Sequence, residues 1–183
     1  MNKKWSIALS FVAGILVTVL VPILVLAAGV VNMGADAKPG LIERTLAPWA
    51  RDRSVDKRAT TEKDPYDGNP AAIAVGFDHY RENCVICHGA PGVAGAELSK
   101  GLNPPAPSLG KGENGTPDGE LFWVIKHGIR MTAMPAFGPT HTDEEIWKIV
   151  TFLRHLPDLT KEERDSLQAA TSGEAHHHEG ETR

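Results

Sequence analysis

The sequence is poor in cysteine: it has two in 183 residues, Cys84 and Cys87, three positions apart. So few cysteines exclude a disulfide framework, and a tetrahedral zinc site would need two further ligands from elsewhere in the chain. The chain also lacks a basic excess, since its formal net charge at pH 7 is −4, which argues against a nucleic-acid binder with a basic face. Apolar residues (42%) and charged residues (23%) are near globular averages, so the chain is not wholly disordered.

Long uncharged runs are scarce, and the main one covers residues 7–29. At 1.5 Å per residue this run crosses a hydrocarbon core of about 30 Å, so residues 1–31 are predicted to form a transmembrane helix. Lys3 and Lys4 precede it and by the positive-inside rule stay cytoplasmic, which places the rest of the chain in the periplasm or on the outer face of the cytoplasmic (inner) membrane. The alternative is a cleaved signal peptide, for which Ala35-Asp36-Ala37 has suitable spacing, although the apolar run is longer than a usual signal core.

No stretch has the pattern of a strand, so the predicted fold class is all-α. Residues 32–68 are predicted to be a periplasmic linker that contains a short amphipathic helix at 41–49, able to lie on a membrane or dock on a domain. Residues 69–158 form the predicted domain, with a helix capped by Asn69-Pro70, one over 118–127, and one opened by a Thr142–Glu145 capping box.

Residues 159–183 are predicted to be a polar, acidic tail. His176, His177 and His178 offer loose ligands for a divalent metal there, but a solvated tail is the simpler interpretation. The charge is uneven along the chain: residues 69–158 and 159–183 each carry −3, whereas 1–31 carry +2 and 32–68 are neutral.

The motif Cys84-Val85-Ile86-Cys87-His88 is the attachment sequence for a c-type haem. Two thiols three positions apart at a helix end reach the two vinyl groups of one porphyrin, and the next residue places an imidazole under the iron. A redox-active dithiol is the alternative, but it predicts a βαβ setting and has no use for the adjacent histidine. The prediction is one covalently bound haem c, held by Cys84 and Cys87 and ligated by His88.

The sixth iron ligand has two methionine candidates in the predicted domain, Met131 and Met134. Pro135 biases Met134 toward an extended backbone that suits a ligand loop, so Met134 is preferred and Met131 is the runner-up, with apolar packing as its other role. A histidine ligand is a further alternative, with candidates at His79, His127, His141 and His155.

The order of these pieces resembles a class I monohaem cytochrome c from about Asn69 to Leu156. The resemblance is carried by Gly76 and Tyr80 before CVICHG, NPPAPSL at 103–109, LFWVIKHGI at 121–129, MPAFG at 134–138 and EEIWKIVTFLRHL at 144–156. It implies a fold of about three to four helices around the haem, in which the first and last cross where Gly76 and Tyr80 meet Ile149 and Phe152. It also implies that a proline carbonyl, best matched by Pro107, accepts a hydrogen bond from His88, and that Met134 is the second axial ligand.

The expected function is electron transfer between membrane respiratory or photosynthetic proteins by a tethered carrier, not an enzyme, with no small-molecule substrate. A flexible linker of about 40 residues would give a reach of several tens of ångströms. The acidic domain suggests partners with a basic patch. The alternatives are a fixed haem subunit of a larger respiratory or dehydrogenase complex, and a haem peroxidase or gas sensor, which needs an open sixth position.

Overall fold

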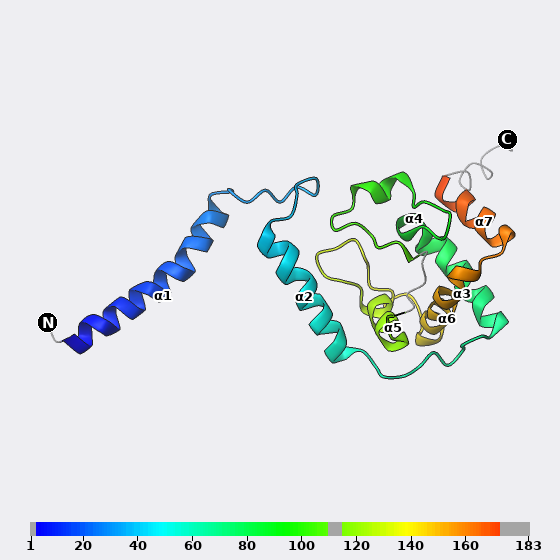
Figure 1. The fold of residues 1–183 in the computed structure, drawn as a ribbon, viewed down its shortest axis with the longest axis horizontal. Helices are drawn as coiled ribbons and strands as arrows, with labels where there is room; N and C mark the ends of the chain where they lie inside the picture. Colours follow the sequence, from blue (N-terminus) through cyan, green and yellow to red (C-terminus); the bar gives the residue numbers. More distant parts are fainter. Residues whose placement is uncertain (1–2, 110–114, 173–183) are drawn as a thin grey trace. The chain divides into compact units, whose positions relative to one another are not determined.

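The computed structural model describes residues 3–109 and 115–172 of the chain, and in these residues the regular structure is helical (Figure 1). The predicted all-α class is therefore confirmed; an isolated bridge between Ala90 and Val93 is the extended pairing found there. The chain divides into two compact units, Met1–Lys38 and Pro39–Arg183. The elements are α1 (Lys3–Ala27), α2 (Leu41–Arg58), α3 (Pro70–Asn83), α4 (Val85–His88), η1 (Glu97–Gly101), α5 (Asp118–His127), α6 (Asp143–His155), η3 (Leu156–Asp158) and α7 (Lys161–Ser172).

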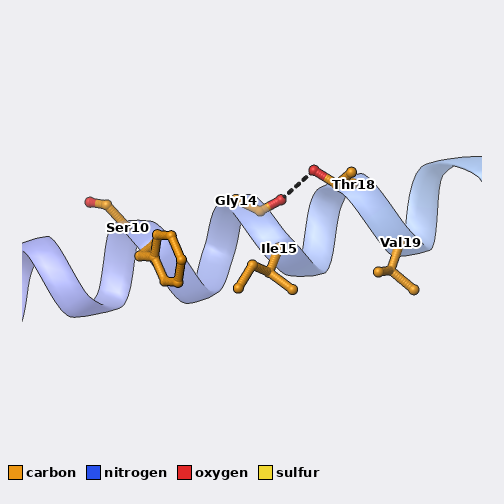
Figure 2. Close-up of a pocket in the computed structure, with 6 residues that line it drawn as sticks. Ser10, Gly14, Ile15, Thr18 and Val19 are labelled. Carbon is orange, nitrogen blue, oxygen red and sulfur yellow. Dashed lines mark hydrogen bonds between the residues drawn. The ribbon is translucent and has the colours of Figure 1, made fainter.

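Helix α1 makes up most of the first unit and is long and apolar enough to cross a membrane, as the sequence predicted. A signal sequence near an N-terminus would form the same kind of helix. Figure 2 shows a shallow hollow on this helix, where Ser10, Gly14 and Thr18 follow one another at four-residue spacing. The Thr18 hydroxyl donates to the Gly14 carbonyl at 2.8 Å, so this polar group is satisfied within the helix, as an apolar surrounding requires.

The second unit is built on the crossing of α3 and α6, which lie against each other (Figure 1). Helix α3 begins where predicted, because the Asn69 side chain accepts hydrogen bonds from the amides of Ala71 and Ala72. At Gly76 the two backbones come so close that an added Cβ would lie 2.0 Å from the Lys148 carbonyl oxygen and 2.7 Å from the Phe152 Cβ. The absence of a side chain at Gly76 is therefore what lets the helices cross here.

Helix α5 packs on α6, with the ring of Phe122 stacked on Trp147 at 4.5 Å between centroids. Helix α6 has the predicted capping box, since Thr142 accepts from the Glu145 amide while the Glu145 carboxylate accepts from the Thr142 amide. Its inward face is fully buried and supplies much of the core, namely Ile146, Ile149, Val150, Phe152 and Leu153.

Two boundaries differ from the sequence prediction. The helix expected at 41–49 in the linker continues to Arg58, because Val55, one and a half turns further on, is buried as α2 meets α5. The first part of the expected acidic tail is helix α7, whose Leu167 is fully buried and whose Arg164 guanidinium donates to the Pro91 carbonyl at 2.7 Å. The domain thus extends on both sides of 69–158; His176–His178 lie outside the described residues.

Candidate functional site

The Cys84–His88 motif occupies the corner where α3 ends and the single turn of α4 begins. Cys84 caps the C-terminal end of α3, and its amide donates to the Tyr80 carbonyl at 2.9 Å. The His88 amide donates to the Cys84 carbonyl at 3.0 Å. One helical turn therefore brings the two thiols and the imidazole to the same corner. Neither thiol is in a disulfide, and both are partly buried.

The environment of Cys84 is unlike that of a reactive thiol. Burial, and secondarily the neighbouring Cys87, raises the pKa of the Cys84 thiol to about 12. Redox dithiols need a lowered thiol pKa so that the attacking thiolate is present near neutral pH. The raised pKa of Cys84 therefore does not favour the dithiol alternative.

The imidazole of His88 is held by a backbone carbonyl in the loop that follows the motif. Its Nδ1 lies 2.9 Å from the carbonyl oxygen of Pro107. Because a carbonyl oxygen only accepts, Nδ1 carries the proton in this contact, and Nε2 is left with its lone pair for a ligand. This is the contact that the resemblance implied, and among Pro104, Pro105 and Pro107 the structure places it at Pro107.

The loop between α4 and η1 folds back over the motif. The Ala96 amide donates to the Ile86 carbonyl at 2.8 Å, and an added Cβ at Gly95 would lie 2.9 Å from the Cys87 carbonyl oxygen. Gly89 has a φ of 63°, and its carbonyl accepts a hydrogen bond from the buried Tyr80 hydroxyl at 2.6 Å. Hydrogen bonds therefore hold the motif from two sides, from Tyr80 of α3 and from Ala96 of the loop.

Met134 lies in the segment between α5 and α6, and its backbone is held at both ends. Its amide donates to the Thr132 hydroxyl at 3.1 Å, and its carbonyl accepts from the Ile129 amide at 3.1 Å. Gly128, with a φ of 64°, makes room for this segment, because an added Cβ there would lie 2.7 Å from the Met134 carbonyl oxygen. The Met134 side chain is half-buried against the core.

The following residues tie the same segment to the end of α5. The Phe137 amide donates to the Ile125 carbonyl at 3.1 Å and the Gly138 amide to the Lys126 carbonyl at 2.9 Å. These are carbonyls of the last helical turn, which have no partner inside a helix. In Figure 1 this segment and the loop after α4 extend to the same side of the domain.

The other candidate ligands lie in different settings. Met131 is 83% exposed and has a φ of 60°. His79 and His141 contact each other edge-to-face at 5.0 Å between centroids, and His155 contacts Glu163 at 3.4 Å. His127 lies beside Trp123 at the end of α5, the helix terminus where a histidine is favoured by the dipole.

One charged cluster near the domain was not predicted from the sequence. The segment between α2 and α3 crosses the start of α5, where the Asp64 amide donates to Asp118 at 3.1 Å and the Arg154 guanidinium donates to Asp118 at 2.9 Å. Partial burial would raise the pKa of Asp118, but the hydrogen bonds from Arg154 and Asp64 hold it below its usual value. The pairing links residues 36 positions apart, and no local spacing signals it.

The donor types at the motif and at Met134 fit a covalently attached haem: two thiols at one helix corner, an imidazole with a defined tautomer, and a thioether on a tied segment. The hollow on α1 in Figure 2 contains none of these residues. The missed contributors are Gly128 and Thr132, which position Met134. Gly128 directly follows the predicted helix over 118–127, and the hydroxyl two residues before Met134 is the signal that was available for Thr132.

Residues 71–153 match the family model described as "Cytochrome C oxidase, cbb3-type, subunit III". The match begins in the first turn of α3 and ends in α6, so it includes the motif, Pro107 and Met134. No curated protein matches the chain.

Proposed function

Because residues 71–153 form a c-type cytochrome domain, which implies haem-based electron transfer, we propose that this chain carries electrons on one covalent haem c with histidine and methionine axial ligands. When bound, the haem supplies an iron that accepts and releases one electron. The observation that carries the proposal is the 2.9 Å contact between His88 Nδ1 and the Pro107 carbonyl, next to the paired cysteines.

Each residue has a distinct task in this proposal. Cys84 and Cys87 hold the porphyrin through thioether bonds, so the group stays attached when the domain changes redox state. His88 presents Nε2, and Pro107 keeps the ring orientation and raises the basicity of that nitrogen. Met134 presents its thioether from the segment tied to α5. In support, its backbone amide and carbonyl are both hydrogen-bonded.

A methionine held in this way favours a carrier over a peroxidase or gas sensor. A sixth ligand occupies the position that a small molecule would need, and thioether ligation raises the reduction potential. Met131, which is exposed, lies on the surface and is a weaker candidate. The proposed activity is therefore electron exchange at the haem edge with larger redox proteins.

The proposed location is the outer face of the cytoplasmic membrane, with α1 as an uncleaved single-pass anchor and the N-terminus inside. In support, α1 carries 24 apolar-rich residues with a mean hydropathy of 2.8. The flexible tether is shorter than the sequence suggested, because α2 is helical and contacts α5. Residues 28–40 remain, and a coil of this length spans about 20 Å on average.

A second candidate function is a fixed haem subunit of a membrane respiratory complex. The observation that favours it is the description of the matching family, which names a subunit of an oxidase. In this case the acidic domain would meet a basic patch on a neighbouring subunit, whereas a free carrier would meet it in brief encounters.

The test of the proposed function is haem retention after denaturation. The wild-type chain, Cys84→Ser, Cys87→Ser and the double variant are produced with haem-attachment machinery and compared by haem staining of denaturing gels. The wild-type band should retain haem, the single variants should retain less, and the double variant none. Haem retained by the double variant would contradict attachment at these cysteines.

Extraction from the native membrane in mild detergent separates the two candidates. The carrier is expected to leave the membrane as a monomeric haem protein of about the mass of the chain, 19.7 kDa, plus haem and detergent. Recovery of a defined larger assembly with stoichiometric haem would instead establish the fixed subunit.

A further inference from the structure

Helix α2 has two halves in different surroundings. Its C-terminal half contacts α5 and buries Val55. Its N-terminal half exposes four large apolar side chains, each 55–74% accessible: Leu41, Ile42, Leu46 and Trp49. We call these four residues the α2 apolar patch.

The α2 apolar patch lies on one side of the helix. At 3.6 residues per turn, positions 41, 42, 46 and 49 fall within an arc of about 140°. Ala47 lies opposite the middle of the patch, and Glu43, Arg44 and Arg51 lie to either side of it on the polar face. Further along the patch side, Asp52 and Arg53 make the surface charged, so the apolar stretch ends after Trp49.

The chain before α2 limits what can cover this patch. Residues 28–40, thirteen residues, separate the end of α1 from Leu41. Even fully extended, thirteen residues span at most about 45 Å. If α1 is the anchor proposed above, Leu41 can never lie further than this distance from the end of α1 at the membrane.

The composition of α2 suits the membrane surface. Helices that lie in the membrane interface combine an apolar face containing tryptophan and leucine with basic residues on the polar side. Helix α2 carries five basic and three acidic residues, so a surface of anionic headgroups attracts it. The basic residues are Arg44, Arg51, Arg53, Lys57 and Arg58.

We infer that the N-terminal half of α2 is an interfacial helix, which inserts Leu41, Ile42, Leu46 and Trp49 into the headgroup region of the membrane that α1 crosses. This inference rests on the proposed anchoring by α1. Since the C-terminal half of the same helix contacts α5, insertion holds the haem domain at the membrane surface instead of leaving it free to range on a long linker. The haem of the domain then lies near the membrane surface, where it can exchange electrons with other redox proteins of the same membrane.

The test uses the full-length haem-loaded protein in vesicles of phosphatidylcholine and phosphatidylglycerol. Because the two cysteines of the chain are consumed by haem attachment, a cysteine introduced into α2 is a unique free thiol. Leu46→Cys carries a fluorescent label on the patch, and Ala47→Cys carries the same label opposite the middle of the patch as a matched control. Quenching is measured with nitroxide groups on the lipid acyl chains and with iodide in the water.

The label at 46 should be quenched severalfold more by the acyl-chain nitroxide than the label at 47, and iodide should show the reverse order. Adding Leu41→Glu and Ile42→Glu to the Leu46→Cys chain should remove the acyl-chain quenching. The inference is overturned if both labels are equally accessible to iodide, as a patch reserved for a protein partner would be. It is also overturned if the glutamate variants leave the quenching unchanged, because the label itself would then drive insertion.

Flotation of the haem absorbance with the vesicles after a high-salt wash separates this inference from the anchoring on which it rests. If the unlabelled chain does not float, the proposed anchoring fails and the inference fails with it. If it floats while the label at 46 stays as exposed as the label at 47, the proposed anchoring stands and only the interfacial helix is contradicted.

Discussion

Tyr80 is fully buried in the core, and its hydroxyl donates to the carbonyl of Gly89 directly after the Cys84–His88 motif. Burial raises the pKa of this phenol, with a further contribution from Cys84, so it stays protonated and remains a donor. A single hydrogen bond thus joins α3 to the residue that follows His88. At this position the side chain stabilises the backbone directly after the motif.

Replacing Tyr80 by Phe removes that donor and leaves a buried carbonyl without its partner. The expected loss of unfolding free energy is about 1–3 kcal/mol. Urea denaturation of the haem-loaded protein measures it. Tyr66→Phe is the control, because Tyr66 lies at the edge of the core and keeps its ring packing; an equal loss in both variants would contradict the role given to the Gly89 contact.

Asp64 and Asp118 are neighbours with opposite electrostatic settings. Burial raises the pKa of Asp64 above its usual 3.8 and outweighs the hydrogen bonds from the Tyr66 amide and the Thr151 side chain, which lower it. The pKa of Asp118 is lowered, as the Arg154 guanidinium outweighs the effect of partial burial. Ionisation therefore opposes folding at Asp64 and favours it at Asp118.

The stabilities of Asp64→Asn and Asp118→Asn, each relative to wild type, should depend on pH in opposite directions. As pH rises from below 3.8 toward neutral, the wild type is progressively penalised at Asp64, so the stability of Asp64→Asn relative to wild type increases. Over the same range the wild type gains from Asp118, so Asp118→Asn falls progressively below wild type. Urea midpoints at a series of pH values measure both differences, and slopes of the same sign would contradict this account.

At the scale of elements, α7 belongs to the domain that the sequence analysis predicted to end at residue 158. Its Leu167 is fully buried, and α7 contacts both α4 and α3. Its Arg164 guanidinium reaches the Pro91 carbonyl in the loop that covers the motif. Helix α7 therefore supports the site from outside the region that matches the family model.

Truncating Leu167 to Ala should cost about 2–5 kcal/mol of unfolding free energy, the usual loss for a leucine removed from a core. Leu98→Ala is the matched control, because Leu98 is 69% exposed, and it should have little effect. Chemical denaturation followed by far-UV circular dichroism measures both. If Leu167→Ala loses no more unfolding free energy than Leu98→Ala, α7 does not contribute to the core of the domain.

The helices that the sequence predicted well are those with local end signals. Asn69 before Pro70, Gly128 after α5, and the Thr142–Glu145 box each act within four residues, so their effect is visible without the fold. Helix α7 has few apolar residues, and its stability depends on partners more than seventy positions away, as the contact of Arg164 with Pro91 illustrates. No local pattern reports such a partner.

The site was predictable to a similar extent. The cysteine pair and His88 are a contiguous motif, and Pro135 marked Met134 as part of an extended segment. The resemblance favoured Pro107 as the proline that faces His88, and the fold brings its carbonyl to the imidazole across nineteen positions of the chain.

At the scale of the whole molecule, charge and apolar surface are separated along the chain. Positive charge lies in the first turn of α1, five basic side chains lie on α2, and residues 69–158 carry a net −3. An anionic membrane therefore attracts the start of the chain and repels the domain. This separation suits a protein that stays at the membrane while its acidic domain meets basic redox partners.

The central claim is that this molecule transfers electrons through a haem held between His88 and Met134. The most direct measurement is spectroelectrochemistry of the full-length haem-loaded chain, following the far-red charge-transfer band of thioether-bound ferric haem together with the reduction potential. In wild type and Met131→Ala we expect the band and one reversible one-electron wave at the same potential; in Met134→Ala we expect the band to vanish and the potential to fall. A band that survives in Met134→Ala, or one that disappears in Met131→Ala, would contradict the account.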